Sequence, residues 1–167
     1  LRAAIRDPNP VLFIEHKALY GNKGEVVTGR ADGALERAAV VRPGRDVTVV
    51  ASLAMVPASL KAAELLAEEG VDVEVIDVRS LRPLDAETVI ESVRRTNRLV
   101  TVEEQPVLGG WGSDVVAAVA EGAFDYLDAP PVRMGLPDAP LPFSPVLERA
   151  AIPSPEAIAE RIRGIVA

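Results

Sequence analysis

The chain has 167 residues, of which 49 % are hydrophobic, and its mean hydropathy of +0.19 is enough for one substantial buried core. A formal net charge of -7 and a pI near 4.8 oppose binding to nucleic acid and to anionic membranes, so neither is expected as a partner. The absence of cysteine excludes disulfides, thiolate metal sites and cysteine nucleophiles, and agrees with a cytoplasmic protein.

The first predicted element is the apolar run Val11–Glu15, which follows a turn cluster at residues 7–10 as a buried strand follows a loop. We interpret residues 1–16 as the last strand of a preceding domain. The sequence starts with Leu1, so we expect it to be cut from a longer chain. The unpaired edges of such a strand favour aggregation, and we expect them to be covered by another chain, covered by missing sequence, or disordered.

Residues 17–45 are polar and rich in glycine with little periodicity, which indicates a linker. The main domain is therefore expected over residues 46–167. It opens with three strand-like runs whose starts are 26 residues apart, separated by helical patterns: Val47–Ala51, Val73–Asp77 and Leu99–Glu103. This alternation predicts βαβ units in a parallel sheet.

Helical patterns fill the intervals between these strands and continue after them. The first helix is expected from about Pro57 to Glu69, and the second starts at Asp85, a good N-cap. Further on, the sequence predicts a third helix, a fourth strand and a final helix, at Ser113–Glu121, at Pro131–Met134 and after the Ser154 N-cap. Together these elements predict an α/β fold with three α/β/α layers around a mostly parallel sheet.

Ligands of open α/β sheets favour the carboxyl ends of the parallel strands, here Ser52–Ala54, Val78–Ser80 and Glu104–Gly112. Only the last segment is distinctive, because Gly109–Ser113 is a glycine-rich turn before a helix, where backbone N–H groups could hold an anion. It is neither a complete G-x-G-x-x-G motif nor a P-loop with its lysine. We therefore favour a structural role, in which the glycines allow close packing.

Four other residues are candidates for chemistry. Glu103 and Glu104 are adjacent, but successive strand residues point to opposite faces, so they cannot share one acid/base site, and we expect Glu104 to hydrogen-bond the following loop. His16, the only histidine, could shuttle protons, although a lone histidine is more often a structural polar group. Trp111 suits either an interface anchor or the core.

A cation site is conceivable near the chain start. The carbonyl of Ala4, the carboxylate of Asp7 and the amide oxygen of Asn9 are hard oxygen ligands around one turn. Three candidates do not complete a coordination shell, and the Asp-Pro-Asn-Pro sequence on its own is more typical of a plain turn.

Several longer motifs occur together in a fixed order: residues 7–20, 73–85 and 98–104, then Gly109-Gly110, with shorter matches through residues 124–153. As a set they resemble the beta subunits of pyruvate and branched-chain 2-oxoacid dehydrogenases over almost the whole chain. The resemblance implies a heterotetramer of two alpha and two beta subunits that uses thiamine diphosphate and Mg. It also implies that this chain carries the last strand of the pyrimidine-binding domain, a linker and a transketolase-type carboxy-terminal domain.

In that family the cofactor-activating glutamate and the active-site histidine lie upstream of Leu1, and His16 does not match the histidine motif. The resemblance thus implies no catalytic and no cofactor-binding residue here, and an inactive chain when alone. It does place a potassium site at Asp7 and Asn9, with the Ala4 carbonyl nearby. The implied partners are an alpha subunit, a second beta subunit and the basic subunit-binding domain of the lipoyl acyltransferase, which an acidic chain suits.

Two alternatives stay open. One is the equivalent domain of transketolase or of 1-deoxyxylulose-5-phosphate synthase, which have a similar strand, Glu-Glu pair and glycine turn. The other is a free-standing flavodoxin-like module that binds a phosphate or nucleotide at Gly109–Ser113. The linker and Ala129–Pro153 look more like the beta subunits. Pyruvate is the expected substrate, ahead of a branched-chain acid or acetoin.

Overall fold

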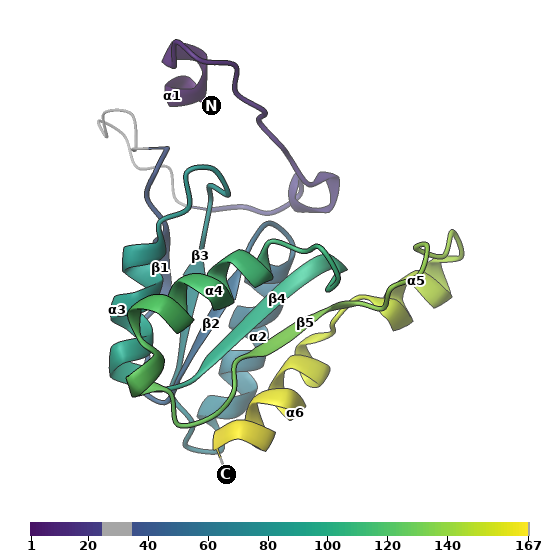
Figure 1. Cartoon of the computed structure of the whole chain (residues 1–167). Helices are drawn as coiled ribbons and strands as arrows, with labels where there is room; N and C mark the ends of the chain where they lie inside the picture. The colour runs from purple at the N-terminus through teal and green to yellow at the C-terminus, as the bar shows by residue number, and fades with distance from the viewer. Residues whose placement is uncertain (25–34, 167) are drawn as a thin grey trace.

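The computed structural model describes residues 1–24 and 35–166. Its centre is a sheet made of β1 (Ala39–Arg42), β2 (Val47–Ala51), β3 (Val73–Asp77), β4 (Leu99–Pro106) and β5 (Val132–Leu136). The strands lie in the order β1-β3-β2-β4-β5 (Figure 1). β2 to β5 pair in parallel, whereas β1 pairs antiparallel with β3 at the edge. The sheet is therefore mostly parallel, as predicted.

Helices cover both faces of the sheet. They are α2 (Met55–Ala67), α3 (Ala86–Thr96), α4 (Gly112–Gly122) and α6 (Pro155–Val166), with the short α1 (Arg2–Arg6), η1 (Lys17–Leu19), η2 (Phe124–Tyr126) and α5 (Pro145–Ala151) outside these layers. α2 and α6 pack on one face, and α3 and α4 on the other (Figure 1). This arrangement confirms the three-layer α/β/α prediction. All described helices are too short or too polar to span a bilayer.

The two faces of the central strands build separate cores. Val49, Val75 and Val100 pack with α2 and α6, whereas Val50 and Ile76 pack with α3 and α4, and all five side chains are completely buried. Successive residues of a strand point to opposite faces, so a strand covered on both sides carries apolar residues at successive positions. This requirement explains the valine-rich runs in the sequence, which the buried polar residues Thr48 and Glu74 interrupt.

Local capping fixes where the helices begin and end. The Asp85 carboxylate accepts a hydrogen bond from the Thr88 backbone N–H at 3.2 Å, which confirms the predicted N-cap of α3. α3 ends at Asn97, whose φ of 60° is the left-handed conformation of many helix ends. Ser154 Oγ likewise accepts from the N–H of Ala157 at the start of α6.

The predicted strand Val11–Glu15 is not formed. These residues carry no strand pairing, and the side chains of Leu12 and Ile14 are 92 % and 67 % exposed. A strand requires a neighbour for its backbone groups, and among the described residues none lies beside this segment (Figure 1). Coverage of the segment by a partner stays a prediction.

The range assigned to a linker, residues 17–45, needs a correction. β1 lies inside it, so the sheet begins before residue 46; the strand is short and sits at an edge, where Val40 and Val41 stay partly exposed and give no alternating pattern. Part of the glycine-rich stretch, including Gly29 and Gly33, falls outside the described residues. The sequence reasoning also missed α5, although proline at its first helical position was an available signal.

Candidate functional site

The glycine-rich turn between β4 and α4 is shaped by close packing. Gly109 has a φ of +72°, which favours glycine. A Cβ added at Gly110 would lie 2.3 Å from Glu103 Oε2, and one added at Gly112 would lie 2.3 Å from Glu103 Oε1. The glycines are therefore needed for contact with a carboxylate of the same chain, which agrees with the structural role favoured from the sequence.

Glu103 is the anion that this turn surrounds. Its side chain is completely buried, and Gln105 Nε2 donates to its Oε2 at 3.0 Å. Burial raises the pKa of Glu103, and this effect outweighs the N–H groups of Gly112 and Trp111 and the charge of Arg133, which favour the ionised form. Because the turn already faces an internal carboxylate, it is a poor cradle for a pyrophosphate, and the residues present do not fit thiamine diphosphate.

Glu104 does not take the role predicted for it. Glu103, not Glu104, contacts the loop that follows the strand, and β4 runs through both residues, so they point to opposite faces as expected. Glu104 instead meets His16: the Nε2 atom lies 2.9 Å from Oε2 and 3.2 Å from Oε1. The histidine thus has a carboxylate partner that is distant in sequence, which no local motif could reveal.

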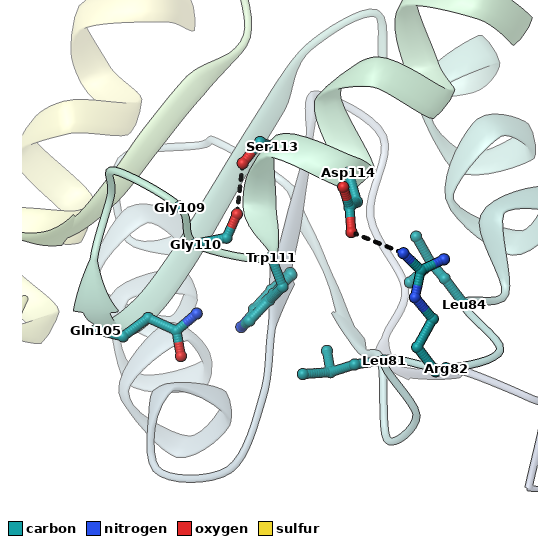
Figure 2. A pocket seen from close by; sticks show the side chains of 9 residues that line it. All are labelled: Leu81, Arg82, Leu84, Gln105, Gly109, Gly110, Trp111, Ser113 and Asp114. Atoms are coloured by element: carbon teal, nitrogen blue, oxygen red, sulfur yellow. Dashed lines mark hydrogen bonds and ion pairs between the residues drawn. The ribbon is translucent and has the colours of Figure 1, made fainter.

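A cavity of about 460 Å³ lies beside the glycine turn (Figure 2). It is bounded by the loop after β3 and by the start of α4, through Leu81, Arg82, Leu84, Gln105, Gly109, Gly110, Trp111, Ser113 and Asp114. Arg82 and Asp114 approach to 3.9 Å across its rim and are both largely exposed. Trp111 lines the cavity and also packs against the core under α3 and α4, so it is partly core and partly available to a partner.

A second cavity, of about 480 Å³, lies at the ends of β2 and β3. Leu53 and Arg79, which line it, have φ values of 49° and 56°, a conformation that non-glycine residues adopt at a cost. The Arg79 N–H donates to Asp77 Oδ1 at 3.1 Å, but burial has the larger effect and raises the pKa of Asp77. The predicted segments Ser52–Ala54 and Val78–Ser80 therefore meet at one crevice.

The three residues of the predicted potassium site lie within one turn. The backbone N–H and side-chain Nδ2 of Asn9 donate to Asp7 Oδ1 at 2.9 and 3.0 Å, which is an Asx turn. The Ala4 carbonyl would accept from residue 8 if α1 continued, but Pro8 has no N–H to donate. Asn9 thus directs its Nδ2 atom at Asp7 while Ala4 lies in α1, and the cation site at these three residues stays a prediction.

Side-chain clusters suited to other metals do not occur in the described ranges. No group of three or more histidines, aspartates or glutamates is placed to hold an ion within residues 1–24 and 35–166. The sequence reasoning missed Arg133, which lies opposite Thr101 in the β4–β5 pairing and whose charge acts on Glu103. A basic residue inside a strand next to one that carries buried Glu103 was the available signal.

Residues 36–158 match the model of the family described as transketolase, C-terminal domain. The match covers most of the chain, and the chain belongs to this family. Its sheet, its two helical layers and the loop after β4 are therefore those of a transketolase-type carboxy-terminal domain.

The curated relatives are beta subunits of pyruvate dehydrogenase. The chain is 47 % identical over 162 residues to pyruvate dehydrogenase E1 component subunit beta-1, mitochondrial, of Arabidopsis thaliana, covering 95 % of this chain and 45 % of that protein. It is 41 % identical over 168 residues to the E1 subunit beta of Rhizobium meliloti, covering 99 % and 36 %. These matches confirm the resemblance to the beta subunits, and the chain spans less than half the length of both relatives.

Solved structures agree on the fold. A split-gene transketolase, solved as an inactive beta4 tetramer, is 31 % identical with a TM-score of 0.73, covering 86 % of this chain and 46 % of the other. A transketolase mutant from Pichia stipitis is 15 % identical with a TM-score of 0.56, covering 77 % and 18 %, and supports the fold alone.

Proposed function

We propose that this chain is the assembly and docking portion of the beta subunit of a thiamine-diphosphate-dependent 2-oxoacid dehydrogenase, with pyruvate as the substrate of the whole enzyme. The observation that carries the proposal is the identity of 41 to 47 % to pyruvate dehydrogenase E1 beta subunits over nearly the entire chain. The internal use of the glycine turn by Glu103 supports a role other than cofactor binding. Thiamine diphosphate, with Mg, would supply the decarboxylation chemistry in the assembled enzyme.

The test is reconstitution with an alpha subunit of a pyruvate dehydrogenase. We expect the chain to add no pyruvate decarboxylation above the alpha subunit alone, because Glu103 fills the glycine turn that would be its cofactor cradle. A full-length beta subunit of a relative, which restores activity in the same assay, is the positive control. Decarboxylation by the chain plus alpha subunit would overturn the assignment of an inactive role.

The proposed partners are the alpha subunit, a second beta subunit and the basic subunit-binding domain of the lipoyl acyltransferase. For the last of these we propose the face made by α2 and α6, where Glu64, Glu160 and, just after α2, Glu68 are exposed. Glu64 is paired with Lys61 and Glu160 with Arg163, so a basic partner has to compete with both of these cations. Complementary charge mainly raises the association rate, so binding should weaken with salt. Changing these three residues to Gln should slow association, whereas Glu87→Gln with Glu91→Gln on α3, on the opposite face, should not.

The split-gene transketolase favours one second candidate, a transketolase-type subunit, because it shares 31 % identity and most of this fold. The identity to the dehydrogenase subunits is higher, so we place it second. Binding of a phosphosugar by an enzyme complemented with this chain would reverse that order.

We keep the cytoplasm as the proposed location, on the basis of the acidic, cysteine-free composition. The Arabidopsis thaliana relative is described as mitochondrial, so fractionation of the source cells is the direct check.

A further inference from the structure

The segment of residues 10–22 lies where related topologies place a ligand. β2 and β4 are neighbours, and the chain leaves β2 toward α2 on one face of the sheet and β4 toward α4 on the other. Such a switch point opens a crevice at the carboxyl ends of the strands. Figure 1 shows the segment with η1 running past these strand ends, outside the layers of the domain.

Apolar side chains of the segment lie near the end of β2. Phe13, Ile14 and Leu19 line the cavity at the ends of β2 and β3 together with Leu53 and Leu60, which belong to the β2–α2 connection and to α2. These contacts leave Phe13 49 % and Ile14 67 % exposed. The hydrophobic effect is non-directional, so partial burial of these side chains does not by itself fix where the segment lies.

One polar contact fixes the position of the segment relative to β4. His16 Nε2 lies 2.9 Å from Glu104 Oε2 at the end of β4, and the two side chains are 27 % and 28 % exposed. The backbone N–H of Ala18 donates to His16 Nδ1 at 3.3 Å, which requires Nδ1 to be unprotonated. In the neutral ring the proton then sits on Nε2, so His16 donates to the Glu104 carboxylate while it caps η1.

We propose that residues 10–22 form a strap across the ends of β2 and β4, and that the His16–Glu104 pair is the clasp that holds it. Glu104 is a positioning residue in this device, since it acts by fixing His16 and, through the His16 ring, the η1 turn. The proposal does not depend on the enzyme to which the chain belongs. It explains why the adjacent glutamates differ: Glu103 organises the glycine turn on one face, and Glu104 holds the strap on the other.

The test measures hydrogen exchange of the amides of Ala18, Leu19 and Tyr20 in the whole chain. Glu104→Ala removes the acceptor, and we expect exchange in the strap to rise about threefold to tenfold, the size of a partly shielded, charge-assisted hydrogen bond. Glu104→Gln keeps an acceptor oxygen and should restore part of the protection. Exchange in β2 and β4 should stay unchanged, because both strands are held by their own cores.

Glu15→Ala is the matched control. Glu15 is also a carboxylate with a hydrogen-bond partner, Tyr20 Oη at 2.9 Å, but both residues belong to the strap. It should therefore change strap exchange much less than Glu104→Ala does. The double variant His16→Ala with Glu104→Ala should exchange no faster than the more affected single variant, because both remove one interaction. Additive effects, or equal exchange in Glu104→Ala and Glu15→Ala, would overturn the clasp.

Discussion

Replacing Gly112 by alanine tests the packing of the glycine turn most directly. The new Cβ would lie 2.3 Å from Glu103 Oε1 and 2.5 Å from Thr101 Oγ1, both on completely buried side chains of β4. Neither side chain can move into solvent. Overpacking of this kind costs roughly 1–3 kcal/mol. Displacing the Glu103 carboxylate from its donors adds about 1–3 kcal/mol, because hydrogen bonds to charged groups are the strong ones.

The sum predicts a loss of about 2–6 kcal/mol in the free energy of unfolding for Gly112→Ala, measured by urea denaturation with Trp111 fluorescence. For a chain of this size that loss lowers Tm by roughly 4–24 °C. Gly164→Ala is the matched control, since Gly164 lies in α6 with nothing within 4 Å of an added Cβ. That change should stabilise the chain by about 0.5–1 kcal/mol through helix propensity.

A second variant tests whether contact with the Glu103 carboxylate causes this loss, or whether the turn rejects any side chain at Gly112. In a Glu103→Ala background the contact with the carboxylate is gone and only the contact with Thr101 Oγ1 remains, so Gly112→Ala should cost less than it does in the native chain. An unchanged cost in that background, or a loss below about 0.5 kcal/mol in the native chain, would refute the role given to Glu103.

Three further changes probe the fold. Burial raises the pKa of Glu103, so its folded state binds a proton more tightly than the unfolded state; its contribution to stability is present below about pH 4.3 and is lost as pH rises. The unfolding free energy of the native chain minus that of Glu103→Gln should therefore fall as pH rises, and a difference that does not change with pH would contradict this. Asp85→Ala should cost about 1–2 kcal/mol, because the carboxylate caps α3 and also accepts from the Ala38 N–H. Burial alone would raise the pKa of Asp85, but its hydrogen bonds lower it overall, so the loss in Asp85→Ala should fade in acid. Ile162→Ala should cost about 2–5 kcal/mol in a calorimetric scan, because this fully buried residue attaches α6 to the core.

The sheet and its covering helices could be predicted from sequence because each carries its own local signal. Val47–Ala51 and Val73–Asp77 are short, mostly apolar and rich in valine, and Asp85 has the side chain that a helix start requires. β1 has no such signal, since its position in the sheet depends on β3, a partner more than thirty residues later. Val11–Glu15 shows the reverse failure: its apolar run is typical of a strand, but strand formation needs a neighbour that the described chain does not provide.

The site was less predictable, for a related reason. The opposite directions of Glu103 and Glu104 follow from the period of a strand, and the sequence was sufficient for that step. Which partner each residue meets depends on tertiary structure, because His16 arrives from the other end of the chain and Arg133 from a neighbouring strand. Local reasoning therefore assigned the loop contact to Glu104, although the glycines are packed on Glu103.

The ends of β2 and β4 connect the fold with the proposed role. Open α/β sheets leave a crevice at this point. Backbone polar groups of the strand ends line one side of it, and the N-terminus of a helix lines the other. Here Glu103 faces the turn that leads into α4, and His16 with Glu104 draws residues 10–22 across the other side. Side chains of this chain therefore occupy both sides of the crevice, Glu103 on one and His16 with Glu104 on the other. This use of the crevice by the chain itself supports the proposed role as an assembly and docking unit.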